Sequence, residues 1–412
     1  MIVIYDTLGS YGGSHTLMLR MCEWLKNHDI NVSIACIDDS NHEIVDRLKR
    51  IGVNVIKADF QYAKKGKLII QKMMAKDNLS FICFSWIKYL DIERIKKKYH
   101  FEFNNILYCI HPETFLKGRS LKARLLINYS KRIYGRIFKR MVDNNSIISV
   151  DPQYIIGTYD YFDFCYLKSV KTIPIPMLIP NIDNYENIIK KGFESNIIMT
   201  AARAEFPYKG YLIGLIDDFD KISKDYKNTE LVIVSSGDDI QLLKDKINSK
   251  VNNCLHKIKL ISWLNYDELK DEMKKAKVFI GMGTTVFDAA LLYKPSIVVA
   301  YNTFDNLSDH FVEENPLLTA SNPKCTNRAI TYLKQALGWS FDEYRSHCIN
   351  SFTKVRNSYD ADNCMKTILN HHPISEKSIL SLKECIRHVV NRRINNLRFK
   401  NSHFAEISRI GK

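Results

Sequence analysis

A glycine-rich turn in the second half of the chain carries groups suited to binding a phosphate. The segment 278–300 (VFIGMGTTVFDAALLYKPSIVVA) has the pattern of a strand, a turn through Gly283, Thr284 and Thr285, and a helix. Glycine allows a tight turn, and the first amides of a helix have no internal partner and favour a phosphate. Asp288 falls one turn into the helix, where its carboxylate could accept two ribose hydroxyls. The alternative is an ordinary turn in which Asp288 compensates the helix dipole.

Two cations follow another predicted strand, 196–201. Arg203 comes just after this strand and Lys209 opens the next helix. A departing diphosphate needs its developing charge neutralised, and an arginine fork with a lysine ammonium provides that. The alternative is a pair of solvated loop cations. Gly237 and Trp263 follow two further strands, where they line a nucleobase pocket or are simply turn and core residues.

The first third of the chain offers a second set of candidates. Gly12 and Gly13 lie in the first strand–helix loop, which either cradles a phosphate or sugar or is a plain turn. His111 directly follows the strand-like run NILYCI, and Glu113 comes two residues later. A histidine at the end of a strand could donate to a reacting sugar or phosphate. The alternative is a buried histidine with a purely structural hydrogen bond.

These candidates follow strands that alternate with helical patterns, which predicts α/β domains with parallel sheets. The predicted strands are 2–5, 31–37, 53–57, 80–84, 105–110, 146–150, 196–201, 230–235, 257–261, 277–281 and 296–300. Three prolines within 174–180 interrupt this alternation. We therefore predict an N-terminal Rossmann-like domain over 1–174, a linker over 175–194, a second Rossmann-like domain over 195–371 and a basic helical tail over 372–412. Ligands of doubly wound sheets bind at the carboxyl ends of the strands, so the cleft between two such domains is the expected site.

The net charge of +15 is concentrated in two segments. Residues 115–142 hold nine basic and no acidic residues, and residues 376–412 hold nine basic and three acidic ones. Within helix 119–142 apolar residues recur every four positions, flanked by cations that include Lys131, Arg132 and Arg136. Such a helix either lies on an anionic membrane surface or buries its stripe in the domain. A nucleic-acid groove ranks last, because no nucleic-acid-binding motif accompanies the charge.

Composition excludes several protein classes. The 412 residues are 46% hydrophobic and 25% charged, which is typical of a globular protein. Ten cysteines occur without a CxxC pair, so zinc ribbons and thioredoxin-type sites are not expected. No apolar run approaches ~18 residues, the length that spans a bilayer. The chain starts on a strand pattern without a basic leader, and we expect a cytoplasmic protein, peripheral on the inner face of the plasma membrane if the basic helix binds it.

Together these motifs resemble the retaining GT-B glycosyltransferases, in the group similar to glycosyltransferase family 4 that builds bacterial surface polysaccharides and lipopolysaccharides. The resemblance spans most of residues 1–300. The family's first-loop glycines match Gly12 and Gly13, and its histidine after a mid-domain strand matches His111. Its arginine and lysine–glycine pair match Arg203 and Lys209. Its helix with a carboxylate followed by small residues matches the helix of Asp288.

The resemblance implies two facing Rossmann-like domains, an acceptor domain over 1–174 and a nucleotide-sugar donor domain over 195–371. It also implies metal-independent transfer from a nucleotide-diphosphate sugar to a glycan or lipid-linked acceptor, in capsule, O-antigen or lipopolysaccharide synthesis. Nucleic acid is not an expected partner. Two departures stand out: Asp288 replaces the commoner glutamate, and Ile280 replaces the family's earlier glutamate. The alternatives are a nucleotide-sugar 2-epimerase of the same shape and, because of Ile280, a non-catalytic nucleotide-sugar-binding homologue at the membrane.

Overall fold

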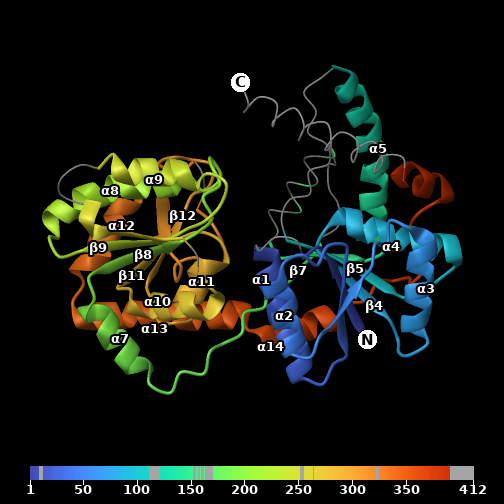
Figure 1. The fold of residues 1–412 in the computed structure, drawn as a ribbon, viewed down its shortest axis with the longest axis horizontal. Helices are drawn as coiled ribbons and strands as arrows, with labels where there is room; N and C mark the ends of the chain where they lie inside the picture. The colour runs from blue at the N-terminus through green and yellow to red at the C-terminus, as the bar shows by residue number, and fades with distance from the viewer. Residues whose placement is uncertain are drawn as a thin grey trace. The chain divides into compact units, whose positions relative to one another are not determined.

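The chain folds into two compact units (Figure 1). The computed structural model describes residues 1–8, 13–110, 121–151, 155, 158, 162, 170–250, 255–262, 264–321 and 324–389. Within the helix 121–143, side chains are described only from Arg132 onward. Unit 1 comprises Met1–Pro176 together with the chain from Ala361, and unit 2 comprises Met177–Asp360.

Unit 1 is built on a parallel sheet whose described strands follow the order β3-β2-β1-β4-β5-β6-β7. The β2 strand is buried at every position, as a sheet covered on both faces requires. Helices α1, α2 and α14 pack together on one side, and α3 and α4 pack on the other (Figure 1). The elements are β1 Ile2–Asp6, α1 Gly13–Asn27, β2 Val32–Cys36, α2 His42–Arg50, β3 Asn54–Lys57, α3 Ala63–Met74, β4 Ser80–Cys83, α4 Trp86–Tyr99, β5 Asn104–Cys109, α5 Leu121–Asp143, β6 Ile147–Ser149, β7 Lys171–Thr172 and α14 Ala361–Leu369.

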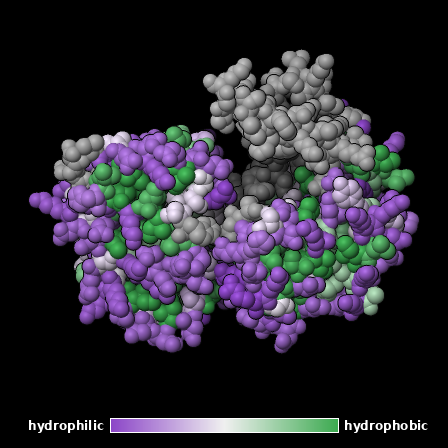
Figure 2. Space-filling model, viewed as in Figure 1, coloured by the Kyte–Doolittle hydropathy of each residue, from purple (hydrophilic) through white to green (hydrophobic). Residues whose placement is uncertain are grey.

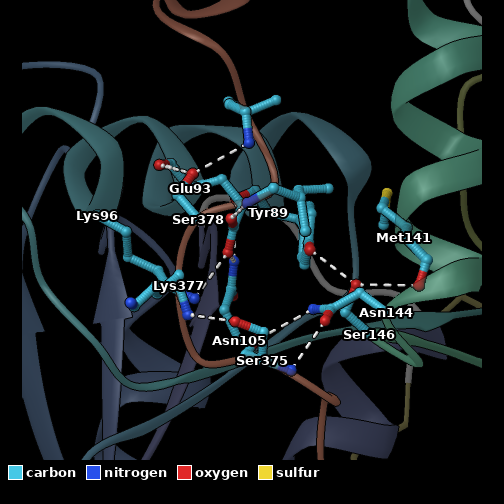
Figure 3. A network of polar contacts seen from close by, with 12 residues as sticks. Tyr89, Glu93, Lys96, Asn105, Met141, Asn144, Ser146, Ser375, Lys377 and Ser378 are labelled. Atoms are coloured by element: carbon cyan, nitrogen blue, oxygen red, sulfur yellow. Dashed lines mark hydrogen bonds and ion pairs between the residues drawn. The ribbon is translucent and has the colours of Figure 1, made fainter.

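The segment after residue 360 returns to unit 1, whereas the sequence assigned 361–371 to the second domain and the remainder to a tail. Figure 3 shows part of the network that holds it: Ser378 Oγ donates to the Glu93 carbonyl at 2.8 Å, and Ser375 N donates to Asn144 at 2.9 Å. In addition, Ile379 N donates to the buried Glu93 carboxylate at 2.9 Å. These partners lie more than 200 residues apart in the chain, so no local pattern announces the docking. Residues 382–389 are helical, as predicted for the tail, and 390–412 lie outside the described residues.

The basic helix α5 buries the apolar stripe over the part whose side chains are described. Tyr134, Ile137, Phe138 and Met141 are buried in the unit 1 core, and Trp86 of α4 packs on Phe138. This part of the stripe therefore serves the fold, because burying an amphipathic face against a core stabilises a helix. The side chains of 121–131, including Lys131, lie outside the described residues.

Unit 2 contains a second sheet, in the order β10-β9-β8-β11-β12-β13, with α8, α9 and α12 on one face and α7, α10, α11 and α13 on the other (Figure 1). Its strands run parallel apart from β13, an antiparallel edge strand that the sequence did not predict. The elements are α7 Tyr185–Glu194, β8 Ile197–Ala201, α8 Tyr211–Asp225, β9 Glu230–Val234, α9 Ile240–Asn248, β10 Ile258–Ile261, α10 Tyr266–Lys275, β11 Val278–Gly281, α11 Thr284–Ala290, β12 Ser296–Val299, β13 Ser308–Phe311, α12 Ala329–Gly338 and α13 Phe341–Tyr359.

Helix α7 occupies half of the predicted linker 175–194. Asn184 caps it by accepting a hydrogen bond from Asn187 N at 3.1 Å, and Ile189 is fully buried against the unit 2 core. The prolines before residue 181 mark only the crossing between the units, and the helix after them belongs to unit 2. Over both units, the face shown in Figure 2 has apolar residues scattered among hydrophilic ones.

Candidate functional site

The loop between β8 and α8 brings both predicted cations to one carboxylate. Arg203 Nη2 lies 3.1 Å from Glu205 Oε1, and Lys209 Nζ lies 3.8 Å from Glu205 Oε2. The Arg203 side chain is 40% exposed and the Lys209 side chain is 19% exposed. The two cations thus lie on either side of one anion at the carboxyl end of β8, where ligands of such sheets bind.

Burial lowers the pKa of Lys209, and the positive charge of Arg203 lowers it further. The carboxylate of Glu205 acts in the opposite direction and raises this pKa. A second anion placed between the cations would stabilise the charged lysine in the same way.

The β9–α9 loop fixes the shape of the β8–α8 loop. Ala204 N donates to Ser236 O at 2.6 Å, and Phe206 N donates to the Asp239 carboxylate at 2.6 Å. Gly237 has φ +124°, and a Cβ added there would lie 2.7 Å from Ala204 O. Only glycine accommodates this conformation and this close approach without strain. Gly237 is therefore explained by loop packing.

The glycine turn between β11 and α11 lies next to the same strand end. Thr285 Oγ1 donates to Ala201 O, the last residue of β8, at 3.4 Å. Gly283 has φ +76°, and a Cβ added there would meet nothing within 4 Å. Helix α11 has seven residues, beginning with Thr284, so its dipole is small. The side-chain charges of Arg203 and Lys209 are thus the larger positive source at this edge.

Asp288 is buried in α11, at 6% exposure, and accepts a hydrogen bond from Tyr266 Oη at 2.8 Å. Sequence reasoning missed this tyrosine, which begins α10. The hydrogen bond fixes the orientation of the carboxylate that was predicted to bind a ribose. Ile280, at the position of the family's earlier glutamate, is fully buried in the unit 2 core.

Several predicted residues lie outside the described residues: Gly12, His111, Glu113 and Trp263. Gly13 is the first residue of α1 and is exposed. Arg132 and Arg136 are exposed on α5.

The sequence analysis did not single out Glu205, the carboxylate that lies near both cations. The spacing of Glu205 and Lys209, four residues apart, was the available signal, but it identifies a pair only in a helix. Here the pair forms within a single turn outside a helix, in which Lys209 N donates to Glu205 O at 2.8 Å. The β9–α9 loop holds this turn in place through its hydrogen bonds to Ala204 and Phe206.

The fold has many counterparts among solved structures. HepE of Anabaena, in complex with UDP and glucose, matches with a TM-score of 0.60 at 11% sequence identity, over 89% of this chain and 98% of that one. A glycosyltransferase from Rickettsia africae matches with a TM-score of 0.60 at 13% identity, over 89% and 96% of the two chains. TarM matches with a TM-score of 0.58 at 12% identity, over 90% and 98%. No protein-family model and no curated protein sequence matches this chain.

This chain has the GT-B fold. Its two parallel-sheet units and helical C-terminus confirm the architecture that the sequence predicted. Sequence identities of 11–13% support the fold alone. Among the described helices, none is long and apolar enough to cross a membrane. The metal independence of the reaction stays a prediction.

Proposed function

We propose that this protein is a glycosyltransferase that takes its sugar from a nucleotide-diphosphate donor held on unit 2. The observation that carries the proposal is that Arg203 and Lys209 lie near one carboxylate just after β8. The last residue of this strand, Ala201, accepts a hydrogen bond from Thr285 of the glycine turn after β11. The complexes of Anabaena HepE with UDP and with UDP-glucose support a nucleotide sugar as the ligand.

The proposed chemistry places the donor diphosphate against the two cations. As the bond from the sugar to the diphosphate breaks, negative charge grows on the departing oxygens. The Arg203 guanidinium forms paired hydrogen bonds to them, and the Lys209 ammonium supplies a second positive charge. The free amides at the start of α11 add donors. We further propose that Asp288, oriented by Tyr266, accepts hydrogen bonds from the ribose.

The remaining steps rest on the family resemblance. We propose that unit 1 carries a glycan or lipid-linked acceptor, that His111 contacts the reacting sugar, and that the anomeric configuration is retained. Cell-surface polysaccharide synthesis is the proposed pathway class. His111 lies outside the described residues, so these assignments are tested by experiments in solution.

The test is a reaction screen read by mass spectrometry. The protein is incubated with UDP-, GDP-, ADP- and dTDP-sugars, each with and without a mixture of lipid-linked and free glycan acceptors. Transfer of one hexose with release of the nucleoside diphosphate supports the proposal. An epimerised nucleotide sugar formed without acceptor indicates the epimerase instead. Binding without turnover of any donor indicates a non-catalytic homologue.

We also propose that α5 contacts an anionic membrane surface through charge alone. Arg132, Arg136 and Lys139 are exposed and spaced along one face of the helix, whereas the described part of the apolar stripe is buried. At about 1 kcal/mol per basic residue near such a surface, three residues contribute about 3 kcal/mol.

Flotation with phosphatidylserine vesicles at physiological salt tests this contact. Replacing Arg132, Arg136 and Lys139 with glutamine should release the protein. The control replaces three exposed lysines of α3, namely Lys64, Lys65 and Lys72, and should leave flotation unchanged. Equal loss in both variants, or no flotation of the wild type, contradicts the proposal.

A further inference from the structure

Glu205 stands where an anionic ligand of the two cations would be expected to bind. Each of its carboxylate oxygens lies near one cation, Oε1 near Arg203 and Oε2 near Lys209. All three side chains are partly exposed at the edge of the sheet. The arrangement resembles the way in which a phosphate group would bridge an arginine and a lysine.

Without an anion between them, the two cations would repel each other. The electrostatic influence of Arg203 on Lys209 is unfavourable to the charged lysine, and that of Glu205 is favourable. Glu205 thus favours the charged form of Lys209 and holds the two cations close together before any ligand arrives. A pre-organised pair of cations binds its ligand without a further ordering cost.

We propose that Glu205 is an internal counter-anion that occupies the diphosphate's place between Arg203 and Lys209, is displaced when the nucleotide binds, and thereby limits how tightly the nucleoside diphosphate product is held. This inference rests on the proposed function. The exchange is favourable because a diphosphate carries more charge than a single carboxylate. The displaced carboxylate then lies near the bound anion, repels it, and returns to the cations as the product leaves.

A counter-anion at Glu205 has the opposite effect on ligand binding from that of a residue that merely supports the loop. If Glu205 competes with the ligand, removing its charge should tighten anion binding. If Glu205 only shapes the loop, its replacement should weaken binding or leave it unchanged. A single charge removed at this distance from a polyanion corresponds to roughly tenfold in affinity.

The experiment measures binding of two probes, inorganic pyrophosphate and UDP, by isothermal titration calorimetry. The variants are Glu205→Gln, which keeps the size of the side chain, and Asp238→Asn as the matched control. Asp238 is exposed on the adjacent β9–α9 loop, so its replacement removes the same charge from the same edge. Circular dichroism melting confirms that each variant folds.

We expect Glu205→Gln to bind both probes roughly tenfold more tightly than the wild type, with Asp238→Asn within about twofold of the wild type. The inference is overturned if Glu205→Gln binds the probes no more tightly than the wild type, or if both variants gain affinity equally. In either case, UDP binding by the wild type leaves the proposed function standing. If no variant and no wild-type protein binds either probe or any other nucleoside diphosphate, both proposals fail.

A pH series adds a measurement that would not change if Glu205 only shaped the loop. Because Glu205 raises the pKa of Lys209, its removal should shift the alkaline loss of pyrophosphate binding to lower pH. The charged groups acting on Lys209 are Arg203 and Glu205, and Tyr208 stands beside it in the loop. An alkaline limb at the same pH in the wild type and in Glu205→Gln contradicts the proposed contact.

Discussion

Replacing Lys294 with methionine should stabilise unit 2 at neutral pH. The Lys294 side chain is fully buried behind α11, and its Nζ donates to Ile188 O at 3.3 Å. Burial lowers the pKa of Lys294 to about 8. The Cys348 thiol, which interacts with this lysine, stays neutral over the relevant range because burial raises its pKa to about 12. A charged group in this place is therefore costly to the fold.

The sign and size of the effect follow from the two pKa values. Below pH 8 both the folded and the unfolded chain carry the proton, and the folded state bears the full penalty. The gap between about 8 and the ordinary lysine value corresponds to on the order of 3 kcal/mol. Between pH 8 and the ordinary value, only the folded state loses its proton, so the stability of the wild type rises with pH. Methionine removes this penalty but leaves the Ile188 carbonyl without its donor, at a cost of about 1 kcal/mol.

Urea titrations at pH 7, 8, 9 and 10 measure the effect. The methionine variant should unfold at a higher urea concentration than the wild type at pH 7, and the difference should shrink by pH 10. Replacing the exposed Lys244 of α9 with methionine is the control and should give no pH-dependent difference. A Lys294→Met variant that is less stable at pH 7, by an amount that does not change with pH, refutes the reasoning.

Three further outcomes are expected. Gly237→Ala should lower stability by about 1–3 kcal/mol in thermal unfolding, because its φ is positive and its Cβ would press on Ala204 O; an unchanged melting temperature contradicts this. Nucleotide binding, followed by calorimetry over pH, should fall on the alkaline side below the ordinary lysine pKa, since Lys209 must stay charged; a flat profile through that range argues against Lys209 as a ligand. Phe138→Ala on α5 should cost about 3–5 kcal/mol, whereas Arg136→Gln should stay within about 0.5 kcal/mol; similar costs for both contradict the buried stripe.

Apart from β7 and β13, the strands could be predicted from the sequence to within one or two residues, because apolar runs between turn residues describe buried parallel strands well. The β9 strand, predicted over 230–235 and found over Glu230–Val234, is one example. The edge strand β13, Ser308–Phe311, could not be found this way, because its sequence SDHF is neither an apolar run nor a clear alternation. Helix α7 was not predicted, because the prolines before it indicated a linker.

Domain membership was harder to predict than secondary structure. The return of the chain to unit 1 depends on contacts such as the hydrogen bond from Trp24 Nε1 to Asp362 at 2.6 Å, which join residues far apart in the sequence. Periodicity reports on near neighbours only. The periodicity indicated that the segment after residue 360 is helical, but it could not indicate which unit this segment packs against.

Part of the candidate site could be predicted from the rule that ligands bind at the carboxyl ends of parallel strands. The loop of Arg203 and Lys209 could be placed at the same sheet edge as the Gly283–Thr285 turn, because parallel strands end together. The position of Glu205 depends on the shape of the loop, which Ser236 and Asp239 hold from a neighbouring loop. The carboxylate of Asp288 was predicted, but its hydrogen bond to Tyr266 required the packing of α10 against α11.

The central claim is that fixed cations at the end of β8 hold a diphosphate. Calorimetric titration of the wild type, Arg203→Ala and Lys209→Ala with UDP, GDP and ADP tests it most directly, with Lys224→Ala, an exposed lysine of α8, as the control. The account predicts that the wild type and the control bind one of these nucleotides equally, and that each of the other two variants binds it about tenfold to a hundredfold more weakly. Wild-type affinity in both Arg203→Ala and Lys209→Ala would contradict it.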